Sequence, residues 1–473
     1  MSTKLTRREF LQAGLAAVAG TTLAPLLREE TYAAAGVDAV RPNLVYIMAD
    51  QLRACSVGCY GNGDIDTPHI DALAAQGAQF TNAVSTSPLC SPHRGCLITG
   101  RYPNINGVTR NDEILPASEI GIAEALAGGL YRTLYIGKWH LNGPTDDPIV
   151  DPGWVAPEDR QGFARWVAFN CAHVYYDGKY YVDKDPLVRQ IPPGVYEPDF
   201  QTGQAIQFIT ANRRRRFCVF LSIGTPHPPG GGSFLPPGGD YHFPYDPETL
   251  TVRPNVDYPD PEYARQAYAD YYGVVSNVDW NVGRVLAALD SLGLATNTIV
   301  VLTSDHGDLL GSQYSRVPGF NFKGLLYTES LNVPFVLRYP ARVAPTLLTD
   351  LFTSVDIMPT LLGLCGIAVP AGVMGRDFSR RLVWGFPPAE PPWGPVPSTN
   401  SALVGMFQGS WLGVHTAEYS LSCTGPNLTP KLFFHNTIDP YQLTNRVDDP
   451  DYQSVREDLL LELQAWLDYV EYA

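Results

Sequence analysis

Residues 42–51 read PNLVYIMADQ, a short apolar run that ends in two polar side chains, Asp50 and Gln51. A continuous apolar run of this length is typical of a strand that is buried on both faces. Four later runs share this character, at residues 133–136, 217–223, 299–302 and 333–337. Helical patterns lie between them, at residues 70–76, 121–127, 202–211 and 263–292. This alternation predicts an α/β fold, in which a mainly parallel sheet is sandwiched by helices.

The composition is that of a folded, acidic protein. The chain has 473 residues, 45% of them hydrophobic and 17% charged, and its formal net charge is −15. Few charges and many apolar residues exclude a disordered chain or a coiled coil. An acidic balance argues against a nucleic-acid partner, which needs a basic face. None of the eight cysteines forms a C-x-x-C pair, which excludes a zinc ribbon; Cys55 and Cys59 either pair or stay free.

Residues 1–35 have the features of a twin-arginine signal peptide. Residues 6–11 read TRREFL, and an uncharged, Ala-rich run at 13–27 is followed by small residues at 33–35. The run is shorter than the roughly 20 apolar residues that span a bilayer. We therefore expect export by the twin-arginine translocase as a periplasmic or secreted protein with no stable membrane anchor. The alternative is a frayed amphipathic helix.

The rest of the chain divides into a predicted α/β domain at 36–385 and an α+β subdomain at 386–473, which begins in a Pro-rich linker. In the subdomain, strand-like runs at 403–407, 411–415 and 432–435 precede a final helix with an apolar stripe between 455 and 470. Two stretches interrupt the α/β alternation: residues 144–198, where Asp177-Gly178 predicts a hairpin turn, and the Pro- and Gly-rich residues 226–261. Long loops are usually functional, so we expect both to overhang a pocket.

Polar side chains follow four of the five predicted strands. They are Asp50, Gln51, Lys138, His140, His227, Asp305 and His306. Ligands bind outside the carboxyl ends of the strands in doubly wound sheets, so these groups should share one edge. Any one of them has an ordinary structural explanation, but their convergence predicts a functional site. The oxygen ligands with one imidazole suit Ca²⁺, Mg²⁺ or Mn²⁺.

A second motif lies at residues 90–100, which read CSPHRGCLITG. Pro92 suits the first turn of a helix and Gly100 its end, which places Cys90 just ahead of the helix and Arg94 about one turn in. A nucleophile or a bound oxyanion gains there from free backbone N–H groups and from the helix dipole. The C-x-P-x-R pattern is only moderately specific by itself, so its context must decide.

From Arg41 onward, that context resembles the sulfatase family of the alkaline phosphatase superfamily. The matching stretches are residues 42–51, 67–74, 90–94, 99–103, 137–140, 303–307, 327–330, 333–335 and 439–445. The resemblance implies an alkaline phosphatase-like fold with a C-terminal subdomain. It also implies an enzyme that hydrolyses small-molecule or glycan sulfate esters to an alcohol and sulfate.

The resemblance further implies a modified nucleophile and a metal ion. In this family a formylglycine-generating enzyme oxidises the motif cysteine, and the hydrate of the resulting aldehyde attacks the ester; Cys90 matches that residue. One divalent cation is implied, with Ca²⁺ expected first and Mn²⁺ as the alternative. Its matching ligands are Asp50, Gln51, modified Cys90, Asp305 and His306.

The remaining catalytic roles follow by the same resemblance. Arg94 and Lys138 would steady the anions, and Asp305 could accept the proton of the nucleophile. His227 and Lys323 match positions near the leaving oxygen and are candidates for the general acid. After the alcohol has left, the second hydroxyl of the hydrate lets the sulfated form collapse to aldehyde and sulfate, assisted by His140.

Three positions depart from the usual family pattern. His93 stands where the family usually has Ser, Gln51 where many members have Asp, and His306 where many have Asn. The combination also resembles choline sulfatases and phosphonate monoester hydrolases, so a phosphonate monoester or phosphodiester hydrolase is the alternative function. A third hypothesis is a catalytically inactive homologue that binds sulfated ligands. Against it, every position expected for the nucleophile, the cation and the anion carries a residue type that can perform that role.

Overall fold

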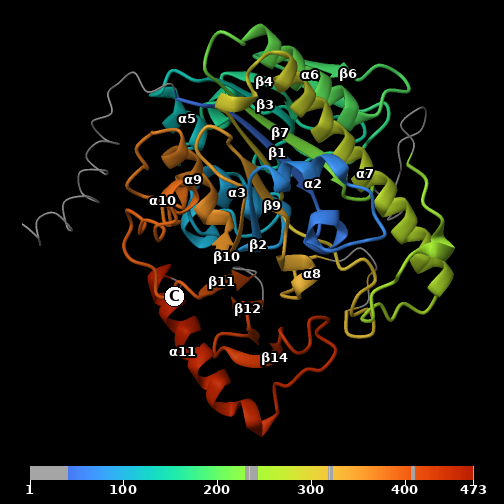
Figure 1. The fold of residues 1–473 in the computed structure, drawn as a ribbon, viewed down its shortest axis with the longest axis vertical. Helices are drawn as coiled ribbons and strands as arrows, with labels where there is room; N and C mark the ends of the chain where they lie inside the picture. Colours follow the sequence, from blue (N-terminus) through green and yellow to red (C-terminus); the bar gives the residue numbers. More distant parts are fainter. Residues whose placement is uncertain are drawn as a thin grey trace, which may run out of the picture. The chain divides into compact units, whose positions relative to one another are not determined.

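The buried strands predicted from the sequence form the centre of one large sheet in the computed structural model, which describes residues 41–229, 234, 243–317, 319, 323–405 and 411–471. The sheet has ten strands in the order β10-β2-β9-β8-β1-β7-β3-β4-β5-β6. At its centre β8, β1, β7 and β3 are parallel neighbours. The predicted α/β fold is confirmed (Figure 1). The predicted signal at 1–35 lies outside the described residues.

The strands of the large sheet are β1 Asn43–Asp50, β2 Ala78–Val84, β3 Arg132–Lys138, β4 Arg165–Phe169, β5 Lys179–Val182, β6 Asp185–Gln190, β7 Phe217–Pro226, β8 Thr298–Ser304, β9 Phe335–Arg338 and β10 Thr346–Thr353. The α-helices are α2 Pro68–Ala75, α3 Cys90–Thr99, α4 Pro103–Asn106, α5 Ile122–Ala127, α6 Glu197–Ala211, α7 Pro261–Ser291, α8 Thr328–Leu331, α9 Ile357–Leu364, α10 Ser379–Trp384 and α11 Gln453–Tyr469.

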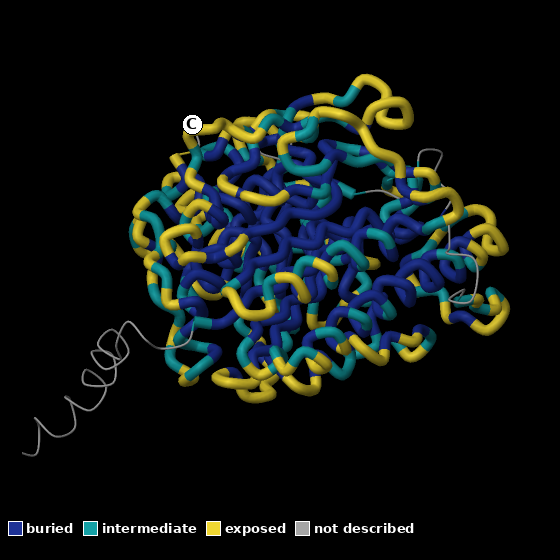
Figure 2. Tube along the Cα trace, turned by 90° about the horizontal axis from the view of Figure 1, so that it is seen from above, coloured by how far each residue is buried: buried dark blue, intermediate teal, exposed yellow. Residues whose placement is uncertain are grey.

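Alternate side chains of the central strands enter two separate hydrophobic cores, as the period of two of a strand requires. In β1, Tyr46 and Met48 face a core that includes residues of α3, α5 and α9. Val45 and Ile47 of the same strand face the core formed with α2, α6 and α7. Figure 1 shows the sheet between these two helical layers, and Figure 2 shows that the interior of the molecule is buried. Because both faces are covered, the strands read as continuous apolar runs.

Three details differ from the sequence prediction. Residues 144–198 were expected to be a loop, but they contain β4, β5 and β6, which extend the sheet. The hairpin joins β5 to β6 at Asp183-Lys184, not at Asp177-Gly178. The predicted run at 333–337 forms β9, which pairs antiparallel with both neighbours, β2 and β8. The second predicted loop is only partly described, because residues 230–233 and 235–242 lie outside the described part.

The C-terminal part of the chain forms the predicted α+β arrangement. Its antiparallel sheet runs in the order β11-β12-β13-β14. The strands are β11 Ser401–Gly405, β12 Trp411–Thr416, β13 Tyr419–Thr424 and β14 Thr429–His435. Helix α11 packs its apolar stripe on this sheet through Leu459, Leu463 and Trp466. Strand β13 was not predicted, and the domain boundary at 385/386 stays a prediction.

Trp466→Ala should destabilise the protein by about 3–5 kcal/mol, because a large buried side chain is lost and a cavity remains. Trp466 is 4% exposed, and its indole N–H donates a 3.0 Å hydrogen bond to Ser401 Oγ. Leu461→Ala on the same helix is the control, since Leu461 is 70% exposed and its loss should cost less than about 0.5 kcal/mol. Thermal or urea unfolding measures both, and equal losses would contradict this account.

Within the described residues, none of the helices combines the length and the apolar character needed to cross a membrane.

Candidate active site

The carboxyl ends of β8, β1, β7 and β3 bring the predicted polar side chains to one edge of the sheet. Asp50 ends β1 and Lys138 ends β3, while Asp305 directly follows β8 and His227 directly follows β7. The side chains of Asp50, Lys138 and Asp305 are inaccessible to solvent, and His227 is half-buried. Gly137, just before Lys138, has a φ of +91°, and a Cβ there would lie 2.0 Å from Ser222 O. Only glycine fits that close approach between strands.

Helix α3 delivers the second motif to the same place. Cys90 is its first residue, one position further into the helix than predicted, and Arg94 follows one turn later. The helix ends before Gly100, whose φ of 65° is the left-handed conformation that commonly closes helices. All residues of α3 are buried. The thiol of Cys90 therefore lies at a helix start inside the protein, where anionic groups are favoured.

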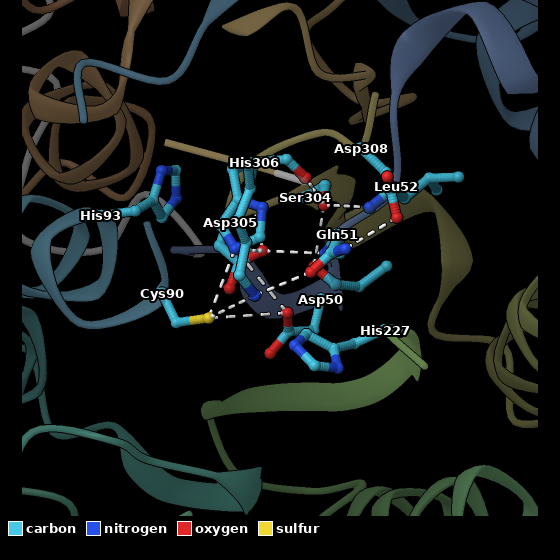
Figure 3. A network of polar contacts seen from close by, with 12 residues as sticks. Asp50, Gln51, Leu52, Cys90, His93, His227, Ser304, Asp305, His306 and Asp308 are labelled. Carbon is cyan, nitrogen blue, oxygen red and sulfur yellow. Dashed lines mark hydrogen bonds and ion pairs between the residues drawn. The ribbon is translucent and has the colours of Figure 1, made fainter. Parts of the chain in front are cut away.

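The predicted cation ligands lie together beside this thiol (Figure 3). Cys90 Sγ lies 3.3 Å from His306 Nε2 and 3.8 Å from Asp50 Oδ1. Asp50, Cys90, Asp305 and His306 each offer one ligand atom, and these atoms all lie within 4.8 Å of one another. Such a spacing suits a single metal ion that contacts all four residues.

The hydrogen bonds around the site orient two of the predicted ligands for a cation. His306 Nδ1 lies 2.9 Å from Gly307 O, and because a carbonyl only accepts, this nitrogen carries a proton and Nε2 is the ring nitrogen left to bind a cation. Gln51 Nε2 donates to Asp308 Oδ2 at 2.7 Å, so its amide oxygen points away from Asp308. The donor set thus consists of carboxylate and amide oxygens with one imidazole nitrogen, which fits a divalent cation.

If this cluster binds a divalent cation, Asp308→Ala should lower the affinity for it about 10- to 100-fold, because the Gln51 amide loses the acceptor that orients it. Asp308→Asn keeps an acceptor oxygen and should lose much less. Calorimetric titration of metal-free protein with Ca²⁺ measures both. Native affinity in the alanine variant would show that Asp308 does not orient a ligand.

Three basic side chains contact members of this cluster. The Arg94 guanidinium donates to Asp50 Oδ2 at 3.2 Å and to Asp305 Oδ2 at 3.0 Å. Lys138 Nζ donates to Asp50 Oδ2 at 2.7 Å. Lys323 Nζ lies 2.7 Å from Gln51 Oε1 and 3.4 Å from Cys90 Sγ. This buried concentration of positive charge can bind an anionic ester in a protein that is acidic overall.

The two carboxylates of the site respond differently to this environment. Burial opposes the ionisation of Asp50, but Lys138, His227, Lys323 and Arg94 hold its pKa well below the usual range. Burial and the nearby charge of Asp50 raise the pKa of Asp305, although His306 and Arg94 oppose this. A divalent cation between the two carboxylates would favour the ionised form of both.

His140 lies at the same edge and is hydrogen bonded to an acidic residue that sequence analysis did not single out. Its Nε2 lies 2.9 Å from Asp112 Oδ1. Burial and Lys138 disfavour the imidazolium, but the hydrogen bond to Asp112 and the nearby sulfur atoms of Cys171 and Cys90 outweigh them and raise the pKa of His140 to about 10. His140 is therefore protonated at neutral pH and adds a further positive charge.

His173 and Asp308 are two more residues of the site that sequence analysis missed. His173 Nε2 lies 3.2 Å from Lys138 Nζ, and Asp308 bonds Gln51. His173 lies shortly after β4, a strand of five residues within the stretch read as a loop. The strand-end rule, applied to residues 165–169, would have found it. Asp308 lies three residues beyond Asp305, and its hydrogen bond to Gln51 depends on tertiary contact.

His93, the departure within the cysteine motif, has a structural environment. It is buried, and its Nδ1 lies 3.1 Å from Ser85 Oγ and 3.0 Å from Ser354 Oγ. The Ser85 hydroxyl donates to Asp305 O at 2.6 Å. Burial holds the pKa of His93 well below its usual range, so the ring is neutral. His93 thus links α3 to the backbone that carries Asp305.

A buried cysteine at a helix start, with carboxylates, an imidazole and basic groups close to it, is an arrangement that can bind and hydrolyse anionic esters, and here it stands on an α/β fold. The sulfatase family model matches residues 42–367, and the chain belongs to the sulfatase family. It is a sulfuric ester hydrolase.

Relatives agree with this assignment. The chain is 34% identical to an ulvan-active sulfatase of Formosa agariphila, over 90% of this chain and 81% of that protein. It is 30% identical to an endo-4-O-sulfatase of Bacteroides thetaiotaomicron, over 92% and 93% of the two chains. A solved B. thetaiotaomicron structure, described with the metabolism of multiple glycosaminoglycans, has a TM-score of 0.78 at 27% identity and covers 91% of this chain and 97% of its own.

A phosphonate monoester hydrolase of Agrobacterium radiobacter has the same fold, with a TM-score of 0.67 at 22% identity, and the match covers 90% of this chain and 96% of that one. At this identity the likeness concerns the fold alone.

Proposed function

We propose that this chain is an exported sulfatase that hydrolyses sulfate esters of a glycan, using Cys90 in its formylglycine form and one divalent cation. The observation that carries the proposal is the position of the Cys90 side chain. It lies within 3.8 Å of two predicted cation ligands and within 3.4 Å of the Lys323 ammonium. Nucleophile, metal and anion-binding groups would thus meet at a single atom.

The proposed cation ligands are Asp50, Gln51, Asp305, His306 and the modified Cys90. When bound, the cation would polarise the sulfate oxygens and favour the ionised form of the nucleophile. Formylglycine, when present, would supply a hydrated aldehyde with one hydroxyl to attack the ester and a second hydroxyl whose loss of a proton expels the sulfate and restores the aldehyde. The hard oxygen ligands favour Ca²⁺, and the imidazole of His306 makes Mn²⁺ the alternative.

The protein's own basic residues would bind and orient the ester. Lys138 is held against Asp50 by a 2.7 Å bond, and Arg94 bridges Asp50 and Asp305. Their charges are fixed before substrate arrives, so little reorganisation is needed as negative charge moves during the reaction. Because the side chains of Lys138 and Arg94 are at most 1% exposed, water competes poorly for them.

Proton transfer would use groups on both sides of the ester. Asp305 would accept the proton of the nucleophile, and His227 or Lys323 would donate a proton to the leaving oxygen. Burial and Lys323 lower the pKa of His227 to about 3. Its Nδ1 proton is also engaged by Pro228 O at 2.6 Å. In the free enzyme His227 is therefore neutral, whereas Lys323 Nζ donates to Gln51 Oε1 and faces Cys90 Sγ. His140 would assist the release of sulfate.

The substrate class and the location are proposed from the relatives and from the N-terminal sequence. The names of two relatives refer to ulvan and to 4-O-sulfate, which supports a sulfated glycan as substrate. The twin-arginine pattern at residues 6–11 supports export by the twin-arginine translocase to the periplasm or beyond. A formylglycine-generating enzyme would act on Cys90 before export.

Co-expression with a formylglycine-generating enzyme, followed by intact-mass analysis and kinetics, tests the proposal. Conversion of Cys90 should lower the mass by about 18 Da. The converted protein should release sulfate from sulfated polysaccharides and from aryl sulfates. If fully converted protein, loaded in turn with Ca²⁺ and Mn²⁺, hydrolysed no sulfate ester, the proposal would be wrong.

The second candidate is a phosphonate monoester or phosphodiester hydrolase, favoured by Gln51 and His306 at the cation site. Paired kinetics on an aryl sulfate and the matching aryl phosphonate monoester separate the two functions. We expect kcat/KM to be higher for the sulfate. A higher value for the phosphonate would favour the alternative.

A further inference from the structure

The strand next to β3 contributes an imidazole that neither the sequence motifs nor the proposed roles include. β4 lies parallel to β3, and His173 follows it by four residues. His173 reaches two proposed catalytic groups at once. Its Nε2 lies 3.2 Å from Lys138 Nζ, and its ring stacks on His227 with centroids 3.6 Å apart and planes 11° apart.

The hydrogen bonds determine which ring nitrogen of His173 carries the proton. The Tyr175 hydroxyl lies 2.7 Å from Gly224 O and 2.5 Å from His227 O, and since carbonyls only accept, its proton is used there. Tyr175 Oη therefore accepts from His173 Nδ1, which lies 3.2 Å away. His173 Nε2 keeps its lone pair and accepts from the Lys138 ammonium.

This arrangement leaves the ammonium of Lys138 both fixed and fully charged. Asp50 and His173 engage two of its three N–H groups. A neutral acceptor such as His173 holds the ammonium without neutralising it, unlike a second carboxylate. These two contacts leave a third N–H, which would donate to an anionic ester.

The stack also fixes the ring of His227. Its Nδ1 is bonded to Pro228 O at 2.6 Å, which sets the direction of the ring edge. The face of His173 then sets the ring plane, and Tyr175, which orients His173, also bonds the carbonyl of His227. The His173 ring thus contacts both the Lys138 ammonium, which is proposed to bind the sulfate, and the His227 ring, which is proposed to lie near the leaving oxygen.

We propose that His173 is a positioning residue of this enzyme, which holds the Lys138 ammonium through Nε2 and the His227 ring by stacking. The inference rests on the proposed roles of Lys138 and His227. A displacement of reacting groups by about 1 Å can cost about 100-fold in rate, so the loss of this shared support should be visible in kinetics.

Three substitutions separate the two contacts of His173. His173→Ala removes both, His173→Phe keeps an aromatic face for His227, and His173→Gln keeps an acceptor for Lys138. Each formylglycine-bearing variant is assayed on a series of aryl sulfates whose leaving phenols differ in acidity. A change in the slope of log kcat/KM against phenol pKa shows that stabilisation of the leaving oxygen is altered. An equal loss of kcat/KM on every ester shows that binding of the sulfate group is weakened.

We expect the alanine variant to lose about 100-fold in kcat/KM on esters of weakly acidic phenols and about tenfold on 4-nitrophenyl sulfate. The phenylalanine variant should lose about tenfold on every ester and keep the native slope. The glutamine variant should show a steeper dependence of log kcat/KM on phenol pKa and only a small loss of kcat/KM on 4-nitrophenyl sulfate. His415→Phe, which replaces a buried histidine in the C-terminal sheet, is the control for folding.

Two results would overturn the inference. One is native kinetics in all three variants. The other is an identical uniform loss in all three, with a fall in Tm larger than that of the His415→Phe control, since that pattern describes a residue needed only for folding. If Cys90→Ala remains inactive while the His173 variants behave as native, the proposed function stands and only this inference fails.

Discussion

Cys90→Ala is expected to lower the turnover of sulfate esters by at least about 10⁴-fold, because it removes the group that becomes the nucleophile. The remaining site would bind substrate and cation but would have no nucleophile to attack the sulfur atom of the ester. Cys90 is 1% exposed and makes no disulfide, so the loss of its small side chain should change Tm by only a few degrees. Sulfate release and thermal unfolding, measured on the same preparation, test both statements.

Cys96→Ala is the matched control. Cys96 is a second buried cysteine of α3, and burial raises its pKa well above that of a free thiol, so it is inert. This variant should keep native turnover within about threefold and show a comparable change of Tm. Native activity in Cys90→Ala would disprove the assigned nucleophile, whatever the control does.

Asp50→Asn is expected to lower kcat/KM by about 10³-fold or more and to reduce the bound metal. Asp50 is a proposed cation ligand and also the shared partner of Lys138 and Arg94. Its replacement by a neutral amide therefore removes a ligand charge and releases the ammonium that would bind the ester. The metal-to-protein ratio after dialysis, from elemental analysis, and the kinetics on an aryl sulfate measure the two effects.

Asp356→Asn controls for the loss of a buried carboxylate as such. Asp356 is 2% exposed and pairs with Arg376 at 3.3 Å, but it lies outside the cluster of proposed ligands. The Asp356→Asn variant should retain native metal content and turnover at a temperature at which it is folded. Full metal occupancy in Asp50→Asn would contradict the proposed cation site.

Much of the fold could be predicted because the central strands are buried on both faces. Residues 44–48 and 217–223 read as apolar runs for that reason, and the structure confirms them as β1 and β7. β2 was missed because half-buried polar residues interrupt its apolar pattern, and β4 because its apolar run at 166–169 is short and lies in a stretch interpreted as a loop. The hairpin signal at Asp177-Gly178 was misleading, since β5 begins only at Lys179, pairs with β4 and turns into β6 after Val182.

The site divides in the same way. The order of the polar residues after the strands, and the cysteine motif at a helix start, are local features, so the sequence by itself determined which side chains reach the sheet edge. Distances, tautomers and partners depend on groups far apart in the chain. The bond of Asp308 to Gln51 and the position of His173 between Lys138 and His227 were decided only by the tertiary structure. The physical reason is that hydrogen bonds and ring contacts act over about 3–4 Å, a range within which only folding brings such residues.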